Sequence, residues 1–313
     1  MHRSMGRQSL ADAAFKASTW CFAVLVLVLL GAVIVTLIDG ALLAIERFGP
    51  SFVVTETWNP VRETFGGRAP MVGTLITSAI AMLFGIPISF GIAVFLTQLC
   101  PVWARRPLGV GIELLAGIPS IIYGIWGLFV LAPYMQSYVQ PFLISTLGAL
   151  PLIGPLFAGP PLGIGMLTAG LILGIMVLPF IASIMRDVFD TVPPMLKESA
   201  YGLGATTWEV VWNVILPYTR IGVVGAIMLG LGRALGETMA VTFVIGNAHR
   251  LSVSLLAPGT TISAALANEF TEAVEDIYQS SLIALGLILF VITLIVLSIA
   301  KYMLIRLQRQ AGT

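Results

Sequence analysis

The segment Thr191–Pro217 reads TVPPMLKESAYGLGATTWEVVWNVILP and lies between long apolar stretches, although it is itself neither apolar enough for a membrane span nor loop-like. Pro193 and Pro194 suit the first turn of a helix, where a missing N–H breaks no hydrogen bond. Gly202 and Gly204 are expected to end that helix after about two turns, because glycine is a poor helix former. The segment is therefore predicted to begin with a short helix that stops at a glycine elbow.

A second helix is predicted directly after the elbow. Thr206 and Glu209 have the spacing of a capping box, in which each side chain binds the other residue's backbone N–H. Pro217 is expected to end this helix. Its apolar residues share one face at helical spacing: Trp208, Val211, Trp212 and Ile215. This two-helix loop (residues 191–217) would suit the docking of another protein, and an ordinary amphipathic surface pair is the alternative.

The composition is that of a polytopic membrane protein. Hydrophobic residues make up 58% of the 313 residues and charged residues only 10%, whereas a soluble domain carries about a quarter charged residues. The net charge of +1, with dispersed basic residues, gives no basis for a nucleic-acid partner. Cys21 and Cys100 lie in or beside apolar stretches, which implies no disulfide framework. His2 and His249 are too few and too far apart for a metal site, and no cofactor is expected.

Six apolar stretches are long enough to cross about 30 Å of hydrocarbon as helices. We predict an all-α protein with spans at about 20–43, 71–99, 112–131, 162–185, 221–245 and 281–305. The first is too long for the apolar core of a signal peptide and is retained as a span. Residues 45–70 are predicted to be a polar loop, residues 135–161 a loop that is either re-entrant or interfacial, and residues 264–269 a short helix.

The distribution of lysine and arginine predicts the orientation of these spans. Eleven basic residues fall on one side of the six spans and four on the other, with Arg233 inside a span. Short cytoplasmic loops carry the excess of positive charge. Both termini and the two-helix loop are therefore expected on the cytoplasmic side. The side with eleven contains Arg3, Arg7, Lys16, Arg105, Arg106, Arg186, Lys197, Arg220, Lys301, Arg306 and Arg309, and the other contains Arg47, Arg62, Arg68 and Arg250.

The fifth predicted span contains the charged residues Arg233 and Glu237, which are four apart and are expected to share a helical face. A charge at the bilayer centre costs about 2.5 to 3.5 kcal/mol. The planar fork of arginine matches a tetrahedral oxyanion, so we predict an anion site in which Glu237 orients the arginine or accepts a proton. A pair that only neutralises itself is the alternative. Gly232 and Gly236 form a GxxxG pattern that predicts close approach of another helix.

Other polar side chains within the spans are candidates for a translocation path. Prolines interrupt three spans, at Pro87, Pro119 and Pro179, and are tolerated where neighbouring helices or a cavity accommodate the freed carbonyls. The candidates on the second and third spans are Thr74, Thr77, Ser78, Ser120 and Tyr123. Hydrogen bonding between helices is the alternative role for each of them.

The two-helix loop resembles the EAA-x3-G-x9-I-x-LP motif of ABC importer permeases. The matching residues are Glu198, Ser199, Ala200, Gly204, Val214, Leu216 and Pro217, with Ser199 in place of alanine and Val214 in place of isoleucine. The resemblance implies the type I ABC importer permease fold. It also implies that this loop forms the coupling helices that are seated in a cleft of the ATPase subunit.

Three stretches sharpen the resemblance to the permeases of phosphate-specific ABC importers: ELLAGIPSIIYGIWGLF (113–129), KESAYGLGATTWEV (197–210) and GLGRALGETMAVTFVIGN (230–247). The resemblance covers nearly the whole chain, with a permease domain at 71–301, preceded by 1–70 and followed by a cytoplasmic tail at 302–313. It implies a path for inorganic phosphate across the plasma (bacterial inner) membrane. The implied partners are the sister permease PstA, two copies of the ATP-binding subunit PstB and the outer phosphate-binding protein PstS.

The chain has no phosphate-binding loop of its own. Its three lysines, Lys16, Lys197 and Lys301, do not follow a glycine, so the G-x-x-x-x-G-K-[ST] pattern is absent from the sequence. ATP hydrolysis would reside in a separate subunit, and the chain is not expected to be an enzyme. An ATP-independent secondary transporter or channel for a small oxyanion is the main alternative, but it leaves the two-helix loop without a role. A membrane enzyme lacks a matching cluster of catalytic residues.

Overall fold

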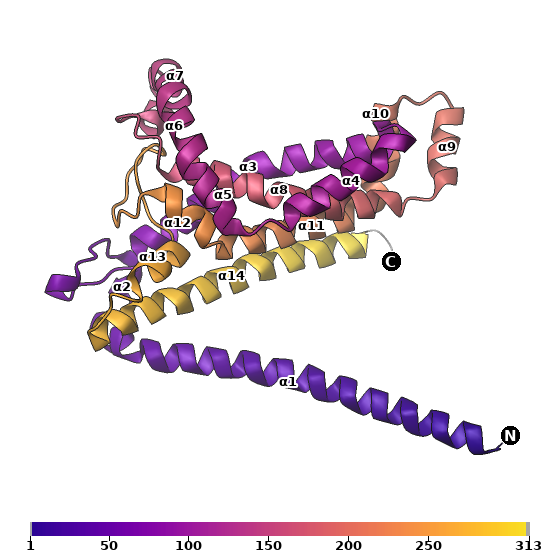
Figure 1. The fold of residues 1–313 in the computed structure, drawn as a ribbon, viewed down its shortest axis with the longest axis horizontal. Coiled ribbons are helices and arrows are strands. Elements are labelled where there is room, and N and C mark those ends of the chain that lie inside the picture. The colour runs from indigo at the N-terminus through magenta and orange to yellow at the C-terminus, as the bar shows by residue number, and fades with distance from the viewer. Residues whose placement is uncertain (1, 311–313) are drawn as a thin grey trace.

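A computed structural model describes residues 2–310, and the side chains of residues 12–306. Within these residues five helices are long and apolar enough to cross a membrane, or six if a bent pair counts as one span. The all-α prediction with six spans is thereby confirmed, with the third span in two pieces. The five long helices are α1 (His2–Phe48), α3 (Arg68–Val94), α8 (Met166–Asp190), α11 (Leu216–Gly236) and α14 (Asp276–Gln310). Figure 1 shows α3, α8, α11 and α14 running together as a bundle.

The centre of the bundle is the contact between α3 and α8, where small residues let the backbones approach. A Cβ built on Gly174 of α8 would lie 3.2 Å from the carbonyl oxygen of Ala81 in α3, and one built on Gly170 would lie 2.6 Å from the side chain of Ile80. Helices in lipid associate by such close packing, because the hydrophobic effect does not distinguish a neighbouring helix from lipid tails. Helix α8 is therefore the central helix of the bundle, and α3 and α11 pack against it.

Helix α11 packs on α8 through Gly230, where a Cβ would lie 2.5 Å from the side chain of Ile181. The close approach predicted at the GxxxG pattern is not made by another helix of the described residues. A Cβ on Gly232 would make only ordinary contact with Leu297 of α14 at 3.6 Å, and one on Gly236 would meet nothing within 4 Å. The close approach is made instead at Gly230, two residues before Gly232, because that face of α11 is turned toward α8.

Helix α1 contacts α14 at one end and diverges from it along the rest of its length, so that the two form a V (Figure 1). The joint is closed by Gly40, where a Cβ would lie 2.9 Å from Ile283, and by a hydrogen bond of 3.0 Å from the Ala44 N–H to the Ser280 hydroxyl. The predicted polar loop at 45–70 packs against this joint. It contains the short helices α2 (Ser51–Val54) and η1 (Pro60–Arg62).

The third predicted span is not straight. Helix α4 (Val102–Ala116) ends before Pro119, and the helical run from Ser120 to Thr146 leaves it at an angle of 87°. Proline lacks the N–H needed for the helix ladder and disfavours helical backbone in the preceding residue, which explains the break. The predicted span at 112–131 is therefore corrected to a bent pair. The second piece comprises α5 (Ser120–Trp126), η3 (Gly127–Leu131), α6 (Ala132–Tyr134), η4 (Met135–Val139) and α7 (Gln140–Thr146).

Two other boundaries differ from the prediction. Much of the expected loop at 135–161 is helical, with irregular backbone and η5 (Gly154–Phe157) only after Thr146. The fourth span begins at Met166 rather than near residue 162. Gly163 and Gly165 have positive φ angles of 79° and 144°, which are not helical, so the helix can begin only after them. The short helix expected at 264–269 is confirmed as α13 (Ile262–Glu269), and η2 (Phe95–Leu99) extends α3.

Candidate functional site

The fifth span is broken next to its charged residues. Helix α11 ends at Gly236, Glu237 has extended backbone (φ −70°, ψ 130°), and α12 (Met239–Ile245) follows as a separate helix. The prediction that Arg233 and Glu237 share a helical face is therefore wrong. The Glu237 carboxylate instead accepts a hydrogen bond of 3.4 Å from the N–H of Ala240 in the first turn of α12. Acidic groups are stabilised at such positions because the N–H groups of a first turn have no partner within the helix.

Arg233 lies where α5, α8 and α11 converge. Its guanidinium carbon is 5.7 Å from the centroid of the Phe180 ring on α8, within the range of a cation–π contact. Tyr123 on α5 is a neighbour of this guanidinium, although its hydroxyl donates to the carbonyl of Leu115 instead. The Arg233 side chain is exposed in this chain, and the ion pairs found among the described residues do not include it. Arg233 is therefore a cation that the described part of the chain does not neutralise.

The bend of the third span is adjacent to the break in the fifth. A Cβ on Gly124 of α5 would lie 2.8 Å from the carbonyl oxygen of Met239, so α5 rests directly on the start of α12. The Tyr123 hydroxyl donates a hydrogen bond of 2.9 Å to the carbonyl of Leu115, which joins α5 to α4 across the bend. Ser120 is half-buried at the first residue of α5. Ser120 and Tyr123 thus lie on the bent segment that meets the charged region.

The hydroxyl candidates of α3 are buried within the chain. Thr74 donates to the carbonyl of Pro70 at 2.8 Å and accepts from the N–H of Ile262 at 3.0 Å, so it ties α3 to the start of α13. Thr77 donates to the carbonyl of Gly73 at 2.8 Å. The buried Ser78 hydroxyl has no hydrogen-bond partner among the described residues. The Thr74 hydroxyl thus makes two hydrogen bonds within the chain, and among these three residues only Ser78 has a hydroxyl without a partner in the described residues.

The two-helix loop has the predicted local structure. Helix α9 (Pro194–Gly202) begins at a proline, and Gly204 follows with a φ angle of 88°. Thr206 and Glu209 form the capping box at the start of α10 (Thr207–Val210): the Glu209 carboxylate accepts from the Thr206 N–H at 2.7 Å, and the Thr206 hydroxyl accepts in return. Both helix starts and the glycine elbow were thus predictable from the sequence alone.

Pro217 does not end the second helix, contrary to the prediction. Helix α10 continues through the π-helical turn η6 (Val211–Ile215) into α11, and the helical run from Thr207 to Gly236 has 30 residues. Pro217 falls in the first turn of α11 after the wider π-helical turn, where its missing N–H is tolerated. The two-helix loop and the helix that carries Arg233 are consequently one continuous element.

The predicted apolar stripe of this helix is divided between the core and the surface. Val211 and Ile215 are fully buried, whereas Trp208 and Trp212 are 65% and 44% exposed, with their rings edge to face at a centroid distance of 5.3 Å. Large exposed apolar groups that cluster on a surface are typical of a protein-binding site. Of the motif residues, Glu198, Ser199, Gly204 and Pro217 are exposed, and Ala200 and Leu216 pack partly against the core.

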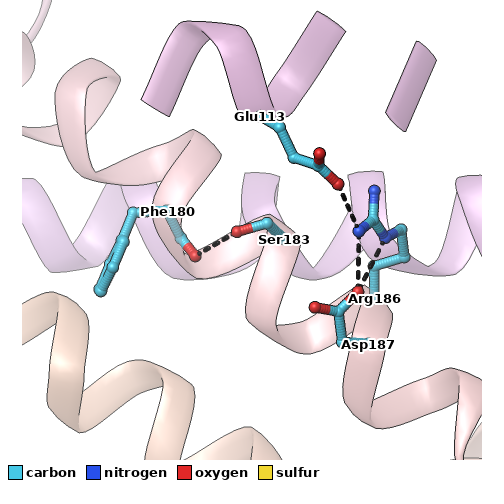
Figure 2. A network of polar contacts seen from close by, with 5 residues as sticks. All are labelled: Glu113, Phe180, Ser183, Arg186 and Asp187. Atoms are coloured by element: carbon cyan, nitrogen blue, oxygen red, sulfur yellow. Dashed lines mark hydrogen bonds and ion pairs between the residues drawn. The ribbon is translucent and has the colours of Figure 1, made fainter. Parts of the chain in front are cut away.

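A charged cluster joins α4 to α8 near the two-helix loop, as Figure 2 shows. The Arg186 guanidinium lies 2.7 Å from the Glu113 carboxylate and 2.8 Å from that of Asp187. Gly109 makes room for it, since a Cβ there would lie 2.7 Å from Arg186 Nη1. A cavity of about 330 Å³ adjoins the cluster and is also lined by Arg105. This cluster was not predicted from the sequence. A glutamate, Glu113, inside a predicted apolar span was the feature that could have indicated it.

A second unpredicted cluster surrounds Glu269 at the opposite end of the bundle. Its carboxylate accepts hydrogen bonds of 2.7 Å from the Trp58 indole and from the Tyr278 hydroxyl, and it contacts His249 Nε2. The Trp58 ring stacks on His249 at a centroid distance of 4.8 Å. Burial alone would raise the pKa of Glu269, but the hydrogen bonds from His249, Tyr278 and Trp58 hold it below its usual value. The cluster thus joins the 45–70 loop, α13 and α14.

These features are those of a membrane transport component, and sequence comparison establishes the family. Residues 85–309 match the family described as "binding-protein-dependent transport system inner membrane component", and the chain belongs to this family. It is therefore a multi-pass protein of the inner membrane. The description also names a transport system that depends on a binding protein.

Individual relatives are similar over almost the full length. The chain is 64% identical over 306 residues to the "phosphate transport system permease protein PstC" of Mesorhizobium japonicum, covering 98% of this chain and 94% of the relative. It is 57% identical over 298 residues to the protein of the same name from Pasteurella multocida, covering 95% and 93%. Among solved structures, an inward-facing MetNI methionine ABC transporter matches with a TM-score of 0.57 at 17% identity, covering 80% of this chain and 99% of that one. This last match supports the permease fold.

Proposed function

We propose that this chain is the PstC-type permease of an ATP-driven importer of inorganic phosphate. The observation that carries the proposal is its likeness, over 98% of its length, to a relative named as a phosphate transport permease. Arg233 supplies chemistry that suits the substrate, because a guanidinium that its own chain leaves without an ion pair can bind a tetrahedral oxyanion with two parallel hydrogen bonds.

The partners follow from the same proposal. A second permease, PstA, would cover the exposed Arg233 and complete the path. Two copies of PstB would supply ATP hydrolysis, and PstS would deliver phosphate at the end of the bundle that carries Glu269. The permease domain would comprise residues 71–301, and the candidates for the path beside Arg233 would be Thr74, Ser78, Ser120 and Tyr123. The two-helix loop and both termini would be cytoplasmic.

The continuous helix from Thr207 to Gly236 gives the proposal a mechanical basis. We infer that PstB binds the exposed Trp208 and Trp212 and the neighbouring residues of α9. ATP-driven closure of the two PstB subunits would then move this loop, and the helix would transmit the movement to Arg233 without an intervening hinge. Access to the arginine would alternate between the two sides of the membrane, which is a two-state coupling between distant sites.

An ATP-independent carrier or channel for a small oxyanion is the competing function, and reconstitution distinguishes the two. The chain, PstA and PstB are placed in proteoliposomes with PstS outside, and phosphate uptake is measured with ATP inside. We expect uptake only with ATP, with phosphate-loaded PstS and with catalytically active PstB. Uptake at the same rate with a PstB variant that cannot hydrolyse ATP would favour the carrier, and uptake of sulfate in place of phosphate would refute the substrate.

A further inference from the structure

We propose that Phe180 is a positioning residue that holds the Arg233 guanidinium against its ring and so sets the direction in which the arginine presents its N–H groups to the anion. The proposal rests on the proposed function, since it concerns the same arginine. The observation behind it is the distance of 5.7 Å from the guanidinium carbon of Arg233 to the centroid of the Phe180 ring.

Arg233 needs an external support because the carboxylate nearest in sequence does not provide one. Glu237 lies beyond the end of α11 and accepts from the Ala240 N–H instead. Arginine is long and rich in rotamers, so a side chain that is exposed and without an ion pair has no fixed direction of its own. The aromatic ring of Phe180 offers an electrostatic attraction to the cation and a flat surface that matches the plane of the guanidinium.

An aromatic support leaves the anion-binding groups of the arginine free, whereas an acidic support competes for them. A ring contacts the face of the guanidinium, and the N–H groups that bind an oxyanion project from its edge. A carboxylate would occupy some of those N–H groups and reduce the net charge of the site. Phe180 can therefore hold Arg233 in place and leave both its charge and its donors available to phosphate.

The ring itself is on a rigid support. Phe180 lies on α8 between Pro179 and Ile181, which are both buried, and its carbonyl accepts a hydrogen bond of 3.0 Å from the Ser183 hydroxyl. In Figure 2 the ring points away from Arg186 and its carboxylate partners, so the charged cluster of α8 does not compete for it. Close packing at Gly230 fixes α11 on α8 less than one turn from Arg233.

The test uses the complete importer in proteoliposomes and compares Phe180→Leu, which removes the ring, with Phe180→Trp, which retains an aromatic face. We expect Phe180→Leu to lower the maximal rate of phosphate uptake about fivefold or more. The KM for loaded PstS should stay near wild type, and so should the ATP hydrolysis that loaded PstS stimulates. The docking of PstS and the coupling to PstB depend on other parts of the chain. Phe180→Trp should restore most of the uptake, and Phe129→Leu is the control for an exposed aromatic on the bent span.

Two outcomes would overturn the proposal. They are wild-type uptake in Phe180→Leu and equal losses in the leucine and tryptophan variants. If Phe180→Leu does not assemble, Phe180→Met replaces it as the variant without a ring. Absence of ATP-dependent phosphate uptake by the wild type would instead refute the proposed function.

Discussion

Arg233 and Glu237 are four residues apart in the sequence, but the helix that carries Arg233 ends at Gly236, and the Glu237 carboxylate binds the N–H of Ala240 in the next helix. The two opposite charges of the fifth span therefore have separate roles. Glu237 stabilises the start of α12, and Arg233 faces out of the chain beside the Phe180 ring. This arrangement favours an anion site over a pair that neutralises itself.

The first prediction concerns Arg233. Arg233→Gln should abolish phosphate uptake while membrane insertion and assembly with the partners survive. Arg233→Lys should rescue poorly, because an ammonium retains the charge but loses the planar pair of donors. Uptake in proteoliposomes is the measurement, and co-purification of the partner subunits is the control for assembly.

The double variant Arg233→Gln with Glu237→Gln decides between the two interpretations of these charges. A pair that only neutralises itself predicts that transport recovers when both charges are removed, whereas an anion site predicts no recovery. We expect none. Glu237→Gln alone should be milder, because the amide oxygen can still accept from the Ala240 N–H. Uptake near the wild-type rate in the double variant would refute the anion site.

The local elements were largely predictable from the sequence, and the breaks were not. Pro194, Gly204 and the Thr206–Glu209 capping box affect only the backbone of neighbouring residues. The helix starts and the elbow that they form were therefore predictable from the sequence alone. The break after Gly236 is adjacent to the contact between α5 and α12, which no periodicity reveals. The pair of Glu113 and Arg186 spans 73 positions in the chain. Such contacts exist only after the helices have packed.

The second prediction concerns the elbow of the two-helix loop. Gly204 has a φ angle of 88° with open space around its Cα, so its requirement is backbone conformation rather than close approach within this chain. Gly204→Val should cost about 1 to 3 kcal/mol of local strain and tilt α9 relative to α10. Stimulation of ATP hydrolysis by loaded PstS should fall several-fold. Gly202→Ala is the matched control, since Gly202 has open space and no positive φ, and it should behave as wild type.

The third prediction concerns orientation. In a background without Cys21 and Cys100, a cysteine at Val54 should react with an impermeant thiol reagent added outside intact cells. A cysteine at Leu203 should react only after the membrane is opened. These positions are 65% and 91% exposed, so accessibility depends on the side of the membrane rather than on burial. The reverse pattern would invert the topology and remove the basis for coupling through the two-helix loop.

The fourth prediction concerns the pH dependence of the Glu269 cluster. A carboxylate whose pKa is lowered in the folded protein stabilises it above the pKa of the unfolded chain, about 4.3. That stabilisation is lost as the pH falls through the lowered value. Glu269→Gln should therefore lower the thermal unfolding temperature of the purified complex most at neutral pH, at a cost of about 1 to 3 kcal/mol. The difference from wild type should shrink in acid. The exposed Glu275→Gln is the control, and a difference that does not change with pH would contradict the assignment.

The last prediction concerns the cluster that joins α4 to α8. A methyl group at position 109 would lie 2.7 Å from Arg186 Nη1, so Gly109→Ala should displace the guanidinium from Glu113. Gly111→Ala is matched to it, because both positions are helical and a Cβ at 111 meets nothing within 4 Å. Alanine in place of a helical glycine gains up to about 1 kcal/mol. We therefore expect Gly111→Ala to raise the unfolding temperature slightly and Gly109→Ala to raise it less or not at all, because the lost ion pair offsets the gain in helix propensity. The ion pair is partly exposed and contributes about 1 kcal/mol or less.

A Glu113→Gln background is the control for this explanation. In it the difference between the two alanine variants should shrink, since the contact that Gly109→Ala breaks is already weakened. Equal effects of the two alanine substitutions would show that Arg186 does not join the two helices.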